Sequence, residues 1–221
     1  MTKSRLAVVP PAGREQLKAL NPEQSQYLEA LKTNDCVIAI GKAGTGKTFM
    51  PAAFAADLFI SKSIKKLILC RPAVSACGEN LGFLPGDLDD KVAPWAYPIV
   101  EILKERLGKG NFQQLMAEEK IEFQSFQHMR GRTFNDAFIM LDEAQNTTPE
   151  QMELFLMRTG DNSRVVITGD LRQADVRGLN GLQDVLRINE RAQIASVVEL
   201  RKVERSELAA KWADAYEEAP R

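Results

Sequence analysis

The sequence predicts an α/β fold in which helices cover both faces of a mainly parallel sheet. Two observations support this prediction. Short apolar runs alternate along the chain with longer amphipathic segments, as in strands joined by crossover helices. In addition, the apolar run at residues 36–40 leads through a glycine-rich loop into an expected helix. In parallel sheets, such loops lie beyond the carboxyl ends of the strands and form ligand sites there.

Six apolar runs are expected to form the strands. Each is rich in Val, Ile, Leu or Phe and ends at polar, glycine or proline residues, as buried strands do. The second run, for example, stops at Arg71-Pro72, where the proline restricts the preceding backbone. The expected strands are residues 36–40, 66–70, 121–123, 137–141, 164–168 and 195–199.

Helices are expected between these strands, and two of them begin with clear capping signals. Asn21 and Thr148 each precede a proline that suits the first helical turn and a glutamine at the capping-box position. Residues 71–98 are rich in glycine and proline and too long for a mere connector, so we expect a functional loop or an insertion there. One helix is expected to start at residue 22. The other expected helices are residues 46–60, 95–107, 112–119, 149–159, 181–188 and 206–218, with a partly helical stretch at 125–132.

Composition and charge fit one globular domain. The 221 residues are 44% hydrophobic and 27% charged, and we expect a flexible arm at residues 1–20 and a single domain at residues 21–221. Lys and Arg number 29 against 30 for Asp and Glu, so any nucleic-acid binding would need a local patch. Three cysteines and one histidine argue against a disulfide framework or a zinc site. No signal peptide or membrane span of ~18 apolar residues is expected, and we expect a cytoplasmic location.

The strongest functional signal is the loop Gly41-Lys42-Ala43-Gly44-Thr45-Gly46-Lys47-Thr48. Its glycines let backbone N–H groups turn around phosphate oxygens at the positive end of a helix dipole. Lys47 is placed to reach the β- and γ-phosphates, and the Thr48 hydroxyl can take one position around Mg²⁺. The spacing therefore predicts a nucleotide site with these binding residues: Gly41, Ala43, Gly44, Thr45, Gly46, Lys47 and Thr48.

Two further polar motifs follow buried strands and should reach the same edge of the sheet. Asp142 is placed to hold Mg²⁺ through water, and Glu143 to activate the attacking water, although a charged pair that merely ends a strand would look the same. Asp170 and Gln173 are suited to sensing the γ-phosphate, with Thr168 holding them in place. An ordinary Gly-Asp turn also explains this third motif.

Gln24 has two interpretations. Its amide can recognise both a donor and an acceptor on an adenine edge. It also stands at the capping-box position of the first helix. The local sequence leaves both interpretations open.

Together these motifs resemble those of known families. Gln24, the 41–48 loop, Asp142-Glu143-Ala144-Gln145 and Gly169-Asp170-x-x-Gln173 resemble the Q motif and motifs I, II and III of the first motor domain of superfamily 1 helicases. Over residues 20–217 the chain is more similar to the PhoH family of phosphate-starvation-associated ATPases. The segments that carry this similarity are residues 43–48, 81–87, 129–133 and 141–151.

The resemblance implies a RecA-like P-loop NTPase core that hydrolyses ATP with Mg²⁺. It also implies a homo-oligomeric ring, expected to be a hexamer, with RNA or single-stranded DNA as its partner. It does not imply unwinding activity. A superfamily 1 helicase completes its ATP site with an arginine from a second motor domain, and we expect that this chain has no room for such a domain.

We therefore expect a neighbouring subunit to supply an arginine at the γ-phosphate. Arg205, ahead of the last expected helix, is the first candidate, and Arg130 and Arg132 are alternatives. An exposed helix-end arginine would look the same as Arg205. Arg130 and Arg132 also suit phosphate contacts to nucleic acid or across subunits, or are simply solvated. Phe83 is suited to stacking on a base or lining a pore, or packs under its own loop.

Three classes of function follow. The first is an oligomeric Mg²⁺-dependent ATPase that acts on, or is regulated by, RNA or single-stranded DNA. The second is an ATP-driven assembly module that remodels a protein partner without nucleic acid, which the near-neutral charge permits. The third is an ATP-binding switch. Glu143 argues against the switch, because binding alone requires no water-activating carboxylate.

Overall fold

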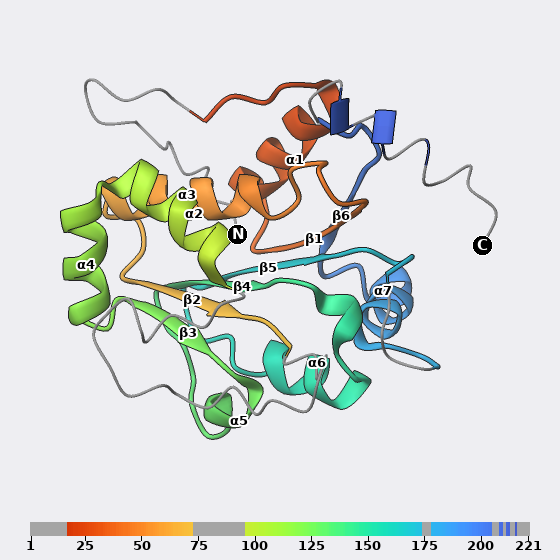
Figure 1. The fold of residues 1–221 in the computed structure, drawn as a ribbon. Helices are drawn as coiled ribbons and strands as arrows, with labels where there is room; N and C mark the ends of the chain where they lie inside the picture. The colour runs from red at the N-terminus through yellow and green to blue at the C-terminus, as the bar shows by residue number, and fades with distance from the viewer. Residues whose placement is uncertain are drawn as a thin grey trace.

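A single parallel sheet organises the part of the chain that the structure describes. The structure is a computed structural model that describes residues 17–72, 96–173, 178–204, 208–209, 211–212 and 215. Within these residues six strands pair in the order β3-β2-β4-β5-β1-β6, and every pairing is parallel (Figure 1). The strands confirm all six expected runs: β1 (Cys36–Gly41), β2 (Lys66–Cys70), β3 (Ile121–Gln124), β4 (Ala137–Leu141), β5 (Arg164–Gly169) and β6 (Ser196–Leu200).

The helices expected between residues 22 and 188 are present with shifted ends, whereas the short turn at residues 144–146 was not predicted. Their bounds are α1 (Pro22–Thr33), α2 (Phe49–Ile60), α3 (Tyr97–Leu107), α4 (Lys109–Ala117), α5 (Phe126–Met129), the 3₁₀ turn η2 (Ala144–Asn146), α6 (Pro149–Leu156) and α7 (Gly181–Ala192). The helix expected at residues 206–218 lies largely outside the described residues. The helix after the glycine-rich loop was expected from residue 46, but residues 46–48 belong to the loop. Helix α7 runs past residue 188 and ends at Gln193, whose backbone is left-handed.

The capping signals were only partly correct. Thr148 and Gln151 form the expected reciprocal capping box of α6. Asn21 caps α1 by accepting a hydrogen bond from the Gln24 backbone, but the Gln24 side chain does not return the bond to Asn21. Among the described helices, none is long and apolar enough to cross a membrane.

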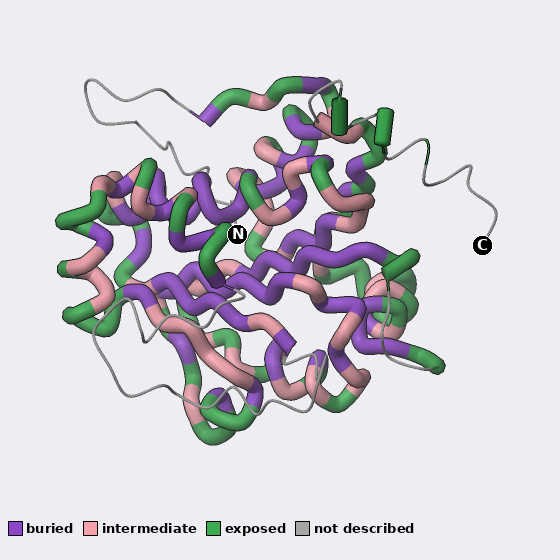
Figure 2. The backbone as a smooth tube through the Cα atoms, in the orientation of Figure 1, coloured by how far each residue is buried: buried purple, intermediate pink, exposed green. Residues whose placement is uncertain are grey.

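Alternate residues of the strands point to opposite faces, and each face has its own core. In one core, helices α1, α2, α3 and α4 pack against strand residues such as Val37 and Met140. In the other core, α5, η2, α6 and α7 pack against strand residues such as Ile38 and Ile139. Figure 2 shows the central strands as the most buried part of the tube. Leu17 lies within the predicted arm of residues 1–20 but is buried in the first core. This residue is therefore part of the packed domain.

The register of the sheet brings the motifs to one edge. Cys70 pairs with Leu141, and Leu141 pairs with Ile167, so the residues that follow β2, β4 and β5 leave the sheet at its carboxyl edge. Strand β1 pairs with β5 and delivers the glycine-rich loop to the same edge. Residues that are far apart in sequence can therefore share one site.

Candidate functional site

The phosphate loop (residues 41–48) needs glycine at two positions for different reasons. A Cβ atom on Gly41 would lie 2.3 Å from the carbonyl oxygen of Leu200 in β6, so the backbone of β6 leaves no space for a side chain there. Gly46 has a φ of +89°, a backbone conformation that is strained for any residue with a side chain.

Hydrogen bonds from inside the loop and from α1 hold the loop in shape. The Thr45 hydroxyl donates to the Lys42 carbonyl at 2.9 Å, and the Lys47 ammonium lies 3.4 Å from the same oxygen. From α1, the Tyr27 hydroxyl donates to the Lys47 carbonyl at 3.1 Å. Burial and the nearby Asp142 carboxylate raise the pKa of Tyr27 well above its usual value, so this donor keeps its proton. The local sequence does not show that the hydroxyl of Tyr27 is bonded to the loop.

The Gln24 side chain helps to hold the phosphate loop in place. Its amide nitrogen donates to the Thr45 carbonyl at 3.1 Å, and its amide oxygen accepts from the Leu20 backbone N–H at 2.9 Å. The predicted capping-box role was therefore wrong, since the partner is Leu20 and not Asn21. Both ends of the amide are bonded to protein, which ties the start of α1 to the phosphate loop.

The Asp142 carboxylate connects the phosphate loop that follows β1 with the ends of β4 and β5. Its Oδ1 accepts hydrogen bonds from the Thr48 hydroxyl at 2.9 Å and from the Thr168 hydroxyl at 2.6 Å. The side chain of Thr168 was expected to hold Asp170 and Gln173, and this expectation was wrong, because its hydroxyl contacts Asp142 and the Leu141 carbonyl. Asp142 is only 3% exposed, so these hydroxyl groups also satisfy a buried carboxylate.

Glu143 adopts an unusual backbone conformation beside Asp142. Its φ and ψ angles are 55° and 42°, in the left-handed region that few residues other than glycine occupy. The Gln145 amide donates to one carboxylate oxygen of Glu143 and accepts from the Asp170 backbone N–H at 3.0 Å. Gln145 therefore links the ends of β4 and β5 and fixes the direction of the Glu143 carboxylate. A strained backbone of this kind is typical of functional positions.

Asp170 and Gln173 lie together in one turn but differ in exposure. The Gln173 backbone donates to the Asp170 carbonyl at 3.2 Å, and the Gln173 side chain is exposed. Asp170 is 3% exposed, with Oδ1 accepting from the Arg172 backbone at 3.0 Å. Its Oδ2 atom is buried and has no hydrogen-bond partner in the structure. A buried oxygen of this kind calls for a partner such as a water or a ligand.

Arg71 joins the same site and was not predicted as a functional residue. It follows β2 directly, and its guanidinium lies 3.9 Å from Oδ2 of Asp142 and 3.6 Å from Oε1 of Glu143. One feature of the sequence could have indicated it, because a charged residue at the carboxyl end of a parallel strand lies at the end of the sheet where ligands bind.

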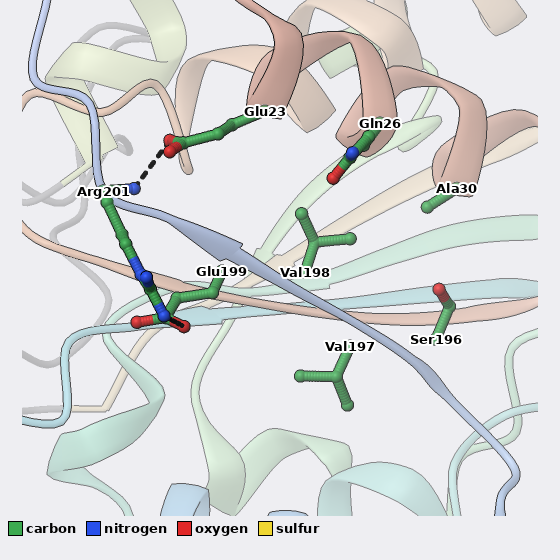
Figure 3. A pocket seen from close by; sticks show the side chains of 8 residues that line it. All are labelled: Glu23, Gln26, Ala30, Ser196, Val197, Val198, Glu199 and Arg201. Atoms are coloured by element: carbon green, nitrogen blue, oxygen red, sulfur yellow. Dashed lines mark hydrogen bonds and ion pairs between the residues drawn. The ribbon is translucent and has the colours of Figure 1, made fainter.

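A segment near the carboxyl terminus packs against the phosphate loop. The Glu204 backbone donates to the Gly44 carbonyl at 2.9 Å, and the Glu23 carboxylate accepts from the backbones of Arg201 and Lys202 at 2.7 and 2.9 Å. Figure 3 shows Glu23 bonded to Arg201 in a hollow between α1 and the edge strand β6. Arg205 lies outside the described residues, so the structure does not test its predicted role.

The two arginines of the 129–133 segment have different surroundings. Arg132 donates to Glu122 at 2.8 Å and lies 4.8 Å above the centre of the Phe134 ring, so it has a structural role in this chain. Arg130 is exposed and lines a groove between α5 and α6. Arg130 is therefore the more accessible of the two for a contact with another molecule. Phe83 lies outside the described residues.

The site residues fit a magnesium ion bound together with a nucleotide. Thr48 and Asp142 place a hydroxyl and a carboxylate oxygen 2.9 Å apart, and Mg²⁺ prefers oxygen ligands of this kind. Mg²⁺ usually takes one or two protein ligands and completes its shell with phosphates and waters.

Comparisons with known proteins show the family of this chain. A family model described as PhoH-like protein matches residues 16–217. A PhoH-like protein of Mycobacterium leprae is 45% identical over 205 residues, covering 91% of this chain and 58% of that relative. The chain thus spans less than two thirds of that relative's length.

Two solved structures match the chain at low sequence identity. The HK97 bacteriophage large terminase matches with a TM-score of 0.50 and 10% identity, covering 90% of this chain and 43% of the terminase. The Pif1 helicase from Candida albicans matches with a TM-score of 0.47 and 14% identity, covering 90% of this chain and 43% of the helicase. The α/β core is RecA-like, and the match over residues 16–217 shows that this chain belongs to the PhoH-like protein family.

Proposed function

We propose that this chain is a Mg²⁺-dependent ATPase that hydrolyses ATP to ADP and phosphate. The observation that carries the proposal is the convergence of the Thr48 and Thr168 hydroxyls on Asp142, with Glu143 as the next residue. A phosphate loop alone supports nucleotide binding. A buried carboxylate at the loop, followed by a second carboxylate held by Gln145, also supports chemistry on the bound nucleotide.

Each residue has a distinct part in the proposed reaction. The phosphate loop and Lys47 bind the phosphates, and Thr48 and Asp142 hold the metal ion. Mg²⁺, when bound, would neutralise charge on the phosphate oxygens. Glu143 orients and activates the attacking water, and Gln145 keeps its carboxylate in position.

Phosphate release from ATP tests this proposal. The wild type should release phosphate with Mg²⁺ present and stop when EDTA removes the metal. Lys47→Ala should abolish both turnover and tight nucleotide binding, because it removes the cation nearest the phosphates. A wild-type protein that binds Mg²⁺·ATP without releasing phosphate would be a nucleotide switch, and the proposed hydrolysis would be wrong.

We further propose that the chain works as a homo-oligomeric ring, expected to be a hexamer, on RNA or single-stranded DNA. The family resemblance and the exposed Arg130 support a nucleic-acid partner. Turnover should rise with single-stranded RNA or DNA, and the rise should shrink at higher salt, because phosphate contacts release counterions. Lack of binding at low salt would instead favour an assembly module that remodels a protein partner.

A further inference from the structure

Arg71 places a guanidinium at the catalytic edge of the sheet from within the same chain. Its position is set by the register of β2 and β4, where the Asp142 backbone donates to the Cys70 carbonyl at 2.9 Å. We propose that Arg71 is a catalytic residue that acts in cis: its guanidinium would contact the γ-phosphate of bound ATP. This inference rests on the proposed ATPase function and adds a residue to it.

The first argument is the position between the two carboxylates. Asp142 is the proposed metal ligand, because it is bonded to the Thr48 hydroxyl. Glu143 is the residue proposed to activate the attacking water. The Arg71 guanidinium lies 3.9 Å from the first carboxylate and 3.6 Å from the second, so it is close to both the proposed metal ligand and the proposed water-activating group. A cation at this place can neutralise the charge that develops in the transition state.

The second argument is the distribution of contacts around Asp142. Both threonine hydroxyls bond to Oδ1, whereas Arg71 faces Oδ2. A Mg²⁺ ion bound at Asp142 would repel the guanidinium, and screening is weak because the Asp142 side chain is only 4% exposed. ATP brings phosphate oxygens to the same place. Guanidinium groups bind such oxygens well, often through two N–H groups at once.

The third argument comes from a comparison with another arginine of the chain. Arg106 binds the buried Asp57 with nitrogen to oxygen distances of 2.7 and 2.8 Å, as expected for a fixed structural pair. The contacts of Arg71 with Asp142 and Glu143 are about an ångström longer, at 3.9 and 3.6 Å. The Arg71 side chain is 27% exposed, so a ligand that enters from solvent can reach it.

Two measurements on Arg71→Gln test the proposal. Phosphate release at saturating ATP should fall about 10²- to 10³-fold, as when one transition-state donor is lost. Independently, Mg²⁺ titrated into the complex of the protein with a fluorescent ADP should bind at least as tightly as in wild type, because a competing cation is gone. Arg187→Gln, which removes a 60% exposed arginine of α7, should change neither quantity.

The two results together separate catalysis from structural damage. A variant that merely distorts the site would lose Mg²⁺ affinity along with turnover, and that outcome would overturn the proposal. Turnover within about twofold of wild type would also overturn it, while the proposed ATPase function would stand. Arg71→Lys, which keeps the charge without the planar fork, should recover only part of the lost rate. If wild type itself releases no phosphate, the proposed function fails first.

A mixing experiment tests the claim that Arg71 acts in cis. Arg71→Gln and Glu143→Gln chains are co-expressed with different tags, and the mixed assemblies are isolated through both tags. Because Arg71 must share a chain with Glu143, the mixture should remain inactive. Recovery of turnover would show that the arginine acts across subunits and would overturn the cis assignment. The matching pair, Arg205→Ala with Glu143→Gln, should recover turnover if Arg205 serves a neighbouring site.

Discussion

At the scale of single residues, the site depends on neutral hydroxyl groups as much as on charges. Thr168 is fully buried, and its hydroxyl donates to Asp142 at 2.6 Å. This hydroxyl and that of Thr48 share the same carboxylate oxygen, which fixes the orientation of the Asp142 side chain. Asp142 can therefore present its other oxygen to the centre of the site.

Replacing Thr168 by Val tests this role with little change in shape. Valine removes the donor, and a hydrogen bond to a charged group contributes about 1.5–3 kcal/mol. Turnover per bound Mg²⁺·ATP should therefore fall about 10- to 100-fold, as measured by phosphate release with Mg²⁺ varied. Thr168→Ser, which keeps the hydroxyl, should stay near wild type. Equal activity of the valine and serine variants would contradict the role.

The sequence revealed the residue types of the site better than their partners. The spacing of residues 41–48 and the pair after β4 predicted which groups meet, because parallel strand ends share one edge. It did not reveal that Gln24 bonds to Thr45 or that Thr168 bonds to Asp142, since those partners lie 21 and 26 residues away along the chain. Arg71 was missed because no short motif surrounds it.

At the scale of elements, a buried ion pair connects α2 to α3. Arg106 donates to both carboxylate oxygens of Asp57, and the Asp57 side chain is only 8% exposed. Arg106→Ala would leave a buried charge without this partner, so the free energy of unfolding should fall by about 3–5 kcal/mol in urea titration. Lys65→Ala, at a pair whose lysine is 76% exposed, should leave the urea midpoint unchanged. A similar small effect for both variants would argue against the ion pair as a stabilising element.

A second ion-pair network, at the β3 edge of the sheet, gives a prediction about pH. Burial acts to raise the pKa of Glu122, but hydrogen bonds from Lys66 and Arg132 outweigh it and lower the pKa below its ordinary value of 4.5. A carboxyl group whose pKa is lowered on folding stabilises the protein above the unfolded pKa. This stabilisation is lost as pH falls through the folded value.

Urea titrations of wild type and Glu122→Gln at several pH values test this network. The stability difference between the two proteins should be largest near neutral pH and should shrink as pH falls below 4.5. A difference that is constant with pH would show that the Glu122 charge does not stabilise the fold.

Element positions were predictable where packing is strongest. The four inner strands are largely continuous apolar runs because both faces of the sheet are covered there, and all six strands were confirmed. Helix ends were less predictable, since tertiary contacts decide them. Helix α7, for instance, continues past residue 188 until the left-handed Gln193, where Asn189 bonds to the backbone of residues 194 and 195.

At the scale of the whole molecule, the proposed ring and the source of the arginine become separate questions. The ring was expected partly because an arginine at the γ-phosphate was expected to come from a neighbouring subunit. If Arg71 supplies a guanidinium in cis, the ring needs its own support. Light scattering of the purified protein with and without Mg²⁺·ATP should show an oligomer, expected to be a hexamer, and a monomer under both conditions would contradict the proposal.

The measurement that tests the central claim most directly compares ATP binding and ATP hydrolysis in Glu143→Gln. This variant keeps the size of the side chain and the neighbouring phosphate loop but removes the carboxylate that activates water. Binding of Mg²⁺·ATP should stay within about threefold of wild type, and phosphate release in a single turnover should fall by about 10²-fold or more. A variant that binds ATP and still releases phosphate at the wild-type rate would contradict the assignment of this site as the centre of hydrolysis.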